Sequence, residues 1–276
     1  MNTTAPTADP RRSVRFYAQL AFTIAVCTFL VLPVGFSILA GLTENYFVGL
    51  KSGLTFRWVL EVWTLYRETI WRSLTIAIAC LAVTLVVGVP LAYALARQRE
   101  RFARMVRAIE ELIVLPIAVP GLATALALIL SYGEFRDFRA SWVFILIGHV
   151  LFTLPFMVRS VLAVMLSSQL ATLEEAAASL GAGFAQRFFT VVLPNAMPGI
   201  LAGALMVVTL SIGEFNITWM LHTPLTKTLP VGLADSYASM RLEIGSAYTV
   251  IFFFMIIPLL VAMQRVTQYN QNKNRI

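Results

Sequence analysis

Long apolar runs separated by short polar segments make up most of this chain. Six of these runs approach the length of roughly 20 residues that a membrane-spanning helix needs. They cover Tyr17–Leu42, Ile70–Ala96, Leu112–Tyr132, Trp142–Leu166, Gly199–Leu221 and the shorter Ala247–Met263. None shows the alternating pattern of a membrane barrel strand, and a backbone in hydrocarbon must satisfy its own hydrogen bonds. The pattern therefore predicts an all-α membrane protein with six transmembrane helices.

The composition favours the same class. Of the 276 residues, 59% are hydrophobic and 13% are charged, which is far more apolar than a soluble domain. The first run is too long for the core of a signal peptide and lacks an obvious small-residue cleavage site, so we expect a retained helix. Cys27 and Cys80 each lie inside an apolar run, with no cysteine and histidine cluster nearby. We expect both to be packing residues that form neither a disulfide nor a metal site.

Basic residues indicate the orientation, because short loops rich in arginine and lysine stay in the cytoplasm. The excess lies before the first run, after the second and after the sixth. It consists of Arg11, Arg12, Arg15, Arg97, Arg99, Arg101, Arg104, Arg107, Arg265, Lys273 and Arg275. We therefore expect cytoplasmic tails at residues 1–16 and 265–276, with a transmembrane domain at 17–264. The net charge of +7 follows from this asymmetry and indicates no nucleic-acid partner.

The segment 169–198 joins the fourth and fifth runs on the side expected to be cytoplasmic. Thr172 and Glu175 match a capping box, and Glu174 and Glu175 would then lie in the first turn, where acids favour the helix dipole. Gly181 is expected to end this helix, because glycine adopts the left-handed conformation without the cost of about 1 kcal/mol that a side chain brings.

A second amphipathic stretch follows Gly181 and runs to Leu193 and Pro194, where we expect the chain to change direction before the fifth span. An ordinary connector with solvated glutamates would explain the segment as well. Its length and its exposed Ala, Leu and Phe residues favour a surface that contacts a partner.

The spacing within this segment resembles a known family. Glu175-Ala176-Ala177, three residues, Gly181, nine residues and then Val191-x-Leu193-Pro194 look like the EAA loop of permease subunits of bacterial binding-protein-dependent ABC importers. The likeness extends over roughly Ile70 to Met263, where "LPIAVPGLATALALILSYG", "TLPFMVRSVLAVM" and "SIGEFNITWM" resemble the same group. It implies a coupling helix that contacts an ATP-hydrolysing subunit. The residues implied in coupling are Glu174, Glu175, Ala176, Ala177, Gly181, Leu193 and Pro194.

The resemblance also implies the partners and the location. They are two ATP-binding cassette subunits, a second permease subunit (identical or homologous), an extracytoplasmic solute-binding protein and the lipid bilayer of the bacterial cytoplasmic membrane. The chain itself carries no Gly-x-x-x-x-Gly-Lys-Ser/Thr motif. We therefore expect a transport subunit that is no enzyme and binds no cofactor, with ATP and magnesium held by the partner ATPase.

Glu214 is the most unusual residue of the predicted spans, with Ser211 and Asn216 close by. An acid near the bilayer centre costs on the order of 2.5 to 3.5 kcal/mol, so Glu214 should face protein or water. It could pair with a neighbouring helix, or it could line the translocation path or its gate together with Ser211 and Asn216. The stretch resembles the importer branch for sulfate, molybdate, phosphonates, polyamines and ferric iron, and a single acid does not choose among these solutes.

Milder interpretations cover the other polar residues of the runs. His149 is expected to be a buried, hydrogen-bonding histidine, and Arg159 to extend its charge toward the headgroups. Glu110 and Glu111 are expected to serve the helix dipole and local charge pairing.

Two other classes of function are compatible with several apolar spans. An ion-gradient-driven secondary transporter would work without an ATPase. An intramembrane serine protease would need a nucleophile with a base within hydrogen-bond reach, and no Gly-x-Ser-Gly motif pairs with a late histidine here.

Overall fold

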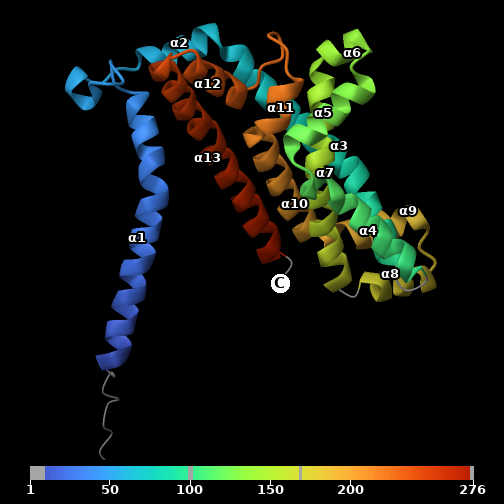
Figure 1. The fold of residues 1–276 in the computed structure, drawn as a ribbon. Coiled ribbons are helices and arrows are strands. Elements are labelled where there is room, and N and C mark those ends of the chain that lie inside the picture. The colour runs from blue at the N-terminus through green and yellow to red at the C-terminus, as the bar shows by residue number, and fades with distance from the viewer. Residues whose placement is uncertain (1–9, 99–101, 168–169, 274–276) are drawn as a thin grey trace, which may run out of the picture.

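The computed structural model describes residues 10–98, 102–167 and 170–273, which are almost entirely helical (Figure 1). The helices are α1 (Pro10–Ala40), α2 (Arg57–Leu65), α3 (Arg67–Gln98), α4 (Ala103–Ala118), α5 (Gly121–Tyr132), α6 (Arg136–Ala140), α7 (Trp142–Ser167), α8 (Leu170–Ser179), α9 (Phe184–Arg187), α10 (Leu193–Gly213), α11 (Asn216–Leu221), α12 (Leu229–Ala238) and α13 (Leu242–Lys273). A 3₁₀ turn covers Gly49–Ser52 and a π-helical turn covers Phe188–Val192. Within these ranges the only strand-like pairing is a bridge between Thr43 and Leu54.

Among the described residues, five helical segments are long and apolar enough to cross a membrane. They are Phe16–Ala40, Arg67–Gln98, Trp142–Ser167, Phe184–Gly213 and Leu242–Arg265. The pair α4 and α5 passes the same test as one unit, which brings the total to six when the pair counts as one span. The predicted class, an all-α membrane protein, is confirmed.

The third apolar run, predicted as one span, consists of two helices. α4 and α5 meet at an angle of 102°. The break falls at Val119, whose backbone is extended (φ −85°, ψ 129°), directly before Pro120. The proline ring disfavours the helical conformation of the residue before it and removes a backbone donor, so the helix must stop there.

The fifth run also differs from the prediction at both ends. Its helical segment begins at Phe184 and ends at Gly213, so it passes Pro194 without the expected change of direction. Pro194 lies in the first turn of α10, where its missing N–H is tolerated, and the π-helical turn comes directly before it. The helix stops at Glu214 and resumes as α11, so the apolar stretch to Leu221 is interrupted.

At the centre of the bundle, α3 and α10 pack against α7 at Met157. Met157 is fully buried, and a Cβ on Gly88 or Gly203 would lie only 2.9 or 2.8 Å from its side chain. A Cβ on Gly199 would lie 2.6 Å from the backbone oxygen of Ser160. Small residues here let the backbones approach closely, as helix packing inside a membrane requires.

α1 stands apart from this bundle (Figure 1) and meets it near its carboxyl end, where Ser37 hydrogen-bonds to Thr249 of α13. None of its most apolar window is buried within the chain. Cys27 is therefore exposed, and the expectation that it packs in the interior is wrong for this chain, whereas Cys80 is buried as expected.

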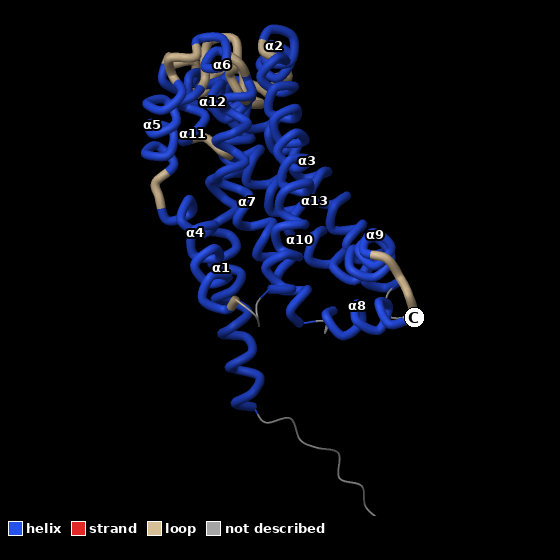
Figure 2. Tube along the Cα trace, turned by 90° about the vertical axis from the view of Figure 1, so that its right-hand side faces the viewer, coloured by secondary structure: helices blue, strands red, loops and turns tan. Residues whose placement is uncertain are grey.

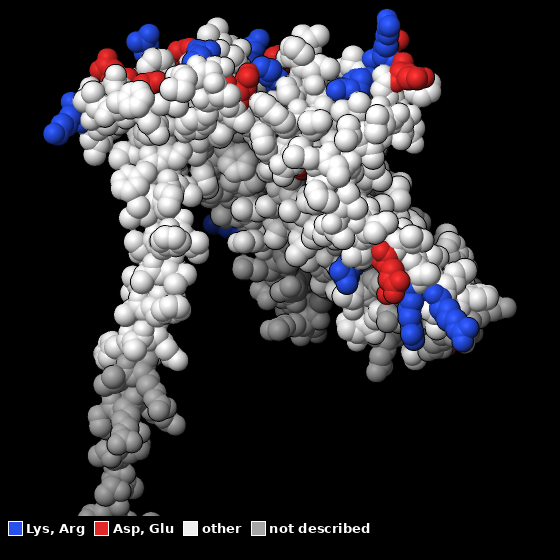
Figure 3. Space-filling view, viewed as in Figure 1, with Lys and Arg blue, Asp and Glu red and all other residues white. Residues whose placement is uncertain are grey.

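The two ends of the bundle differ in what they carry. The α8–α9 segment lies at the same end as the start of α1 and the carboxyl end of α13, while α2, α6 and α12 lie at the opposite end (Figures 1 and 2). On the face shown in Figure 3, charged side chains gather at that opposite end and in a second group at the lower right, with a largely uncharged band between them. Such a band is the surface that hydrocarbon tolerates.

Candidate functional site

The segment between the fourth and fifth apolar runs folds into a helical hairpin, made of α8, α9 and the π-helical turn. Gly181 ends α8 as predicted, with φ +85°. The N–H groups of Gly181 and Ala182 donate to the carbonyls of Ala178 and Ala177, which is the Schellman arrangement. Any other residue at this position would carry a side chain that the backbone conformation disfavours.

The predicted capping box is wrong. α8 begins at Leu170, so Thr172 lies inside the helix, and neither Glu174 nor Glu175 lies in its first turn. The earlier start is possible because Leu170 and Ala171 favour a helix and Leu170 is buried against the bundle.

The predicted coupling residues divide into an outward and an inward group. Glu175, Ala176 and Gly181 are exposed, as is Pro194, while Ala177 and Leu193 are half-buried. Large apolar side chains accompany the outward group, since Leu180 is 89% exposed and Phe184 is 61% exposed. Glu174 differs from all of these, because only 2% of it is exposed.

The carboxylate of Glu174 points into the bundle, where three side chains meet it. The Tyr93 hydroxyl donates to Oε1 over 2.7 Å. The Arg97 guanidinium lies 3.5 Å from Oε2, and that of Arg187 lies 3.7 Å from Oε1. A buried carboxylate needs such partners, because removing a charge from water is costly without them.

Sequence reasoning did not find Tyr93 as a site residue and counted Arg97 only as an orientation signal. Both lie near the carboxyl end of α3, four residues apart, so they share one face of the helix. Tyr93 also packs edge-on against Phe188. This i, i+4 spacing at the end of a span was the one signal that could have grouped them.

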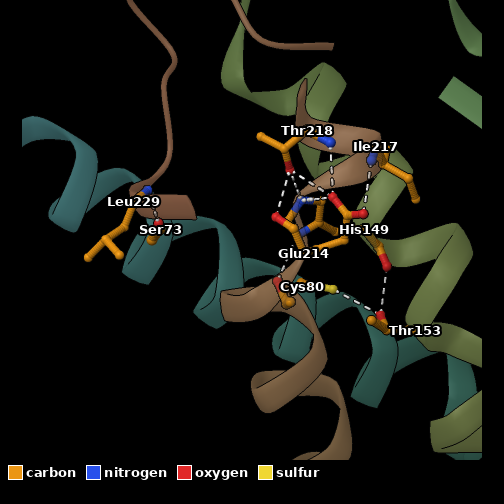
Figure 4. A network of polar contacts seen from close by, with 9 residues as sticks. Ser73, Cys80, His149, Thr153, Glu214, Ile217, Thr218 and Leu229 are labelled. Atoms are coloured by element: carbon orange, nitrogen blue, oxygen red, sulfur yellow. Dashed lines mark hydrogen bonds and ion pairs between the residues drawn. The ribbon is translucent and has the colours of Figure 1, made fainter. Parts of the chain in front are cut away.

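The second part of the site is the break between α10 and α11, shown in Figure 4. Glu214 has an extended backbone (φ −69°, ψ 120°), and its side chain caps the helix that follows. The backbone N–H groups of Ile217 and Thr218 donate to Oε1 and Oε2, each over 2.9 Å, and the Thr218 hydroxyl donates to Oε2 over 3.0 Å. Both carboxylate oxygens are thus used by the chain's own donors.

His149 of α7 connects this cap to the rest of the bundle (Figure 4). Its ring is fully buried, with Nδ1 2.8 Å from the Ser211 hydroxyl and Nε2 2.8 Å from the Thr218 hydroxyl. Since Thr218 gives its hydrogen to Glu214, it accepts from His149, which places the ring proton on Nε2 and makes Nδ1 the acceptor for Ser211. His149 is therefore the buried hydrogen-bonding histidine that the sequence predicted.

Of the three residues predicted around the path, the structure brings two together. Ser211 and Glu214 join one network through His149 and Thr218. Asn216 is exposed at the start of α11, outside that network. His149 also belongs to this network. Its place there could not be predicted from residue spacing, because it lies 62 residues from Ser211 in the sequence.

Replacing His149 by phenylalanine should destabilise the folded protein. The phenyl ring is similar in size, but the Ser211 hydroxyl loses its buried acceptor, at a cost of about 1–3 kcal/mol for an unsatisfied group, and the Thr218 hydroxyl keeps only its bond to Glu214. The midpoint of thermal unfolding of the purified protein should fall. An unchanged midpoint would show that the network carries no stability.

A cavity of about 530 Å³ opens between α4 and α7. Charged side chains line it together with apolar ones, and these are Arg107, Glu110, Glu111 and Arg159. Arg159 therefore faces this cavity, although the sequence predicted only that it reaches toward the headgroups. Ionisable groups within spans usually face a water-filled space or a partner.

Comparison with known proteins assigns the class. Residues 88–275, about two thirds of the chain, match the family described as "Binding-protein-dependent transport system inner membrane component". A putative 2-aminoethylphosphonate transport system permease protein, PhnV of Salmonella choleraesuis, is 24% identical over 92% of this chain and 96% of its own length. The spermidine/putrescine transport system permease protein PotB of Haemophilus influenzae is 28% identical over 74% of each chain.

A solved structure shares the fold. The inward-facing MetNI methionine ABC transporter matches with a TM-score of 0.59 and 17% identity, over 76% of this chain and 98% of the matched chain. The chain thus belongs to the permease family of binding-protein-dependent ABC importers, and it is a multi-pass protein of the inner membrane. The two alternative classes, a secondary transporter and an intramembrane enzyme, are not favoured.

Proposed function

We propose that this chain forms one half of the translocation path of an ABC importer and is driven by ATP hydrolysis on partner chains. The observation that carries this proposal is the α8–α9 hairpin, which presents exposed Leu180 and Phe184 at one end of the spans. Two ATP-binding cassette subunits would dock there and hold the ATP and magnesium, since the chain has no phosphate-binding loop of its own. An extracytoplasmic solute-binding protein would deliver solute at the opposite end.

The contact with the ATPase is assigned to the outward residues of the hairpin. The short helix α8 forms a rod in which Ala176 and Ala177 bring small side chains beside the acidic Glu175, and Gly181 sets the turn that ends it. Leu193 and Pro194 then connect the hairpin to α10 within one continuous helical segment. A push on such a rod moves the attached span as a rigid body.

The path itself is assigned to the face that carries the cavity between α4 and α7. Its charged lining would be costly in contact with lipid, so a second permease subunit, identical or homologous, would close it. At the other end of the spans, the break at Glu214 would act as a gate, because α11 can move relative to α10 without straining a continuous helix. Ser211 and Asn216 flank this break.

The solute is assigned to a small charged class. The names of the relatives suggest a phosphonate or another oxyanion, or a polyamine, as the solute. The resemblance of the fifth run to the importer branch described above adds ferric iron as a candidate. The cavity lining carries both signs of charge, with two arginines and two glutamates. Competition of each unlabelled solute against uptake would choose among them.

Reconstitution tests the whole proposal. The permease, its ATPase and its binding protein would be purified together and placed in liposomes. We expect solute to accumulate only with ATP and the binding protein present. Accumulation driven by an ion gradient without ATP would overturn the proposal and favour a secondary transporter.

The orientation provides a separate prediction. The basic loops predict that both termini and the hairpin lie in the cytoplasm. Reporter fusions at Gln98 and Asn272 should therefore behave as cytoplasmic, and one at Asp235, in α12 at the opposite end of the bundle, as external. A cytoplasmic Asp235 would reverse the assignment of the two ends.

A further inference from the structure

We infer that Glu174 is a positioning residue that clamps the coupling hairpin to α3, so that movement of the hairpin is transmitted to this span through side chains as well as through the chain. The inference rests on the proposed docking of an ATPase at the hairpin. The clamp consists of Glu174, Tyr93, Arg97 and Arg187. It differs from an ATPase contact, because Glu174 faces its own bundle.

The geometry joins three separate parts of the chain. Tyr93 and Arg97 come from the end of α3, Glu174 from α8, and Arg187 from the end of α9. The link to α3 crosses 81 residues of sequence, through the 2.7 Å hydrogen bond from Tyr93 to Glu174. α8 follows α7 in the sequence, so the clamp ties the hairpin to a second span, α3, that is not its neighbour in sequence.

Electrostatic attraction stabilises this clamp more than hydrogen bonds do, because some of its polar atoms have no hydrogen-bond partner. Among the described residues, Glu174 Oε2 and Arg187 Nε are buried without a hydrogen-bond partner. The two guanidinium groups instead lie 3.5 and 3.7 Å from the carboxylate. A partly satisfied buried group is costly, so small displacements of α8 change the energy of the cluster. The clamp therefore keeps α8 close to α3 but permits small shifts of one helix relative to the other.

Arg97 also connects the clamp to the outer surface. Its Nη1 lies 3.7 Å from Oε1 of Glu175, whose side chain is 71% exposed, while its Nε faces the buried Glu174. A partner that binds Glu175 would therefore compete with Arg97 and alter how firmly Arg97 holds Glu174. Adjacent glutamates thus have different roles, one outward for docking and one inward for transmission.

The test uses the assembled importer in liposomes, with Glu174→Gln as the main variant. Glutamine keeps the size and an acceptor for Tyr93 but removes the charge that faces Arg97 and Arg187. We expect the ATPase to co-purify in wild-type amounts and to hydrolyse ATP, while solute moved per ATP falls on the order of tenfold. Tyr93→Phe removes one hydrogen bond and should cause a smaller loss of the same ratio.

Spin labels report the position of the hairpin directly. Gln98 and Ser179 are exposed at the ends of α3 and α8, and both would be changed to cysteine for labelling in a Cys27→Ser background, with the buried Cys80 left in place. The distance distribution between the labels should be narrow in the otherwise unaltered protein and broad with Glu174→Gln.

The outcomes separate this inference from the proposed function. If the unaltered permease recovers no ATPase, the docking proposal fails. The clamp is refuted if the unaltered permease transports solute with ATP and the Glu174→Gln variant shows the same ratio of solute moved per ATP and the same narrow distance distribution between the labels. A lower yield or melting temperature with an unchanged ratio would make the cluster merely structural, which also refutes it. Should Glu174→Gln fail to insert, the ratio for Tyr93→Phe decides alone.

Discussion

Changing Gly181 to valine should reduce ATP-driven uptake to less than about a tenth of the wild-type rate. The backbone at Gly181 has φ +85°, a conformation that costs a residue with a side chain about 1–2 kcal/mol and a β-branched one more. Apart from its chain neighbours, no atom of the described residues lies within 4 Å of the position that a Cβ would occupy, so the effect would come from the backbone alone. The turn would reshape, and α9 would leave its place beside α8.

Gly183 offers a matched control two residues away. Its φ is −66° and its Cβ position is also open, so an alanine there meets neither strain nor a clash. Gly183→Ala should therefore transport normally, whereas Gly181→Ala should lose part of its activity. Uptake and recovery of the ATPase would be measured for each variant. Wild-type uptake by Gly181→Val would show that the shape of the hairpin is not needed for coupling.

Changing Glu214 to glutamine should also cause a large loss of uptake, at least tenfold. The carboxylate receives three donated hydrogen bonds, from two backbone N–H groups and the Thr218 hydroxyl. A glutamine amide accepts on one atom only, and its NH₂ group would face a donor at the other, which leaves a buried group unsatisfied at about 1–3 kcal/mol. The start of α11 would loosen and the proposed gate would no longer close in register.

The measurements are uptake and the stimulation of ATP hydrolysis by the binding protein, with assembly checked by recovery of the ATPase. Glu134→Gln, in an exposed loop, controls for the loss of one acid. We expect an assembled complex that hydrolyses ATP without responding to the binding protein. Full uptake over a range of solute concentrations would leave Glu214 as a helix cap with no part in gating.

Local patterns determined much of this molecule. The apolar runs predicted an all-helical membrane protein, because hydrocarbon leaves a long apolar segment no other way to satisfy its backbone. Gly181 was predicted as a helix end, and its positive φ follows from a constraint within a few residues. The EAA spacing likewise indicated the family from the offsets between residues alone.

Local rules failed where two of them competed. Thr172 and Glu175 fit a capping box, yet burial of Leu170 extends α8 past it. The apolar stretch to Leu221 reads as one span, yet the carboxylate of Glu214 accepts the first N–H groups of α11 and stabilises a second helix start there. The hydropathy of a run depends on its side chains. It gives no sign that one polar side chain, such as that of Glu214, accepts hydrogen bonds from backbone N–H groups and so allows a helix to begin.

Only the tertiary structure decided which charged residues meet. The family resemblance implied that Glu174 and Glu175 both contact a partner, and their opposite orientations follow from the packing of α8 against the end of α3. Neither this pairing nor that of His149 with Ser211 and Thr218 leaves a local signal, since 62 to 81 residues separate the partners. Helix periodicity specifies the face on which a residue lies, whereas the packing of several helices determines what that face meets.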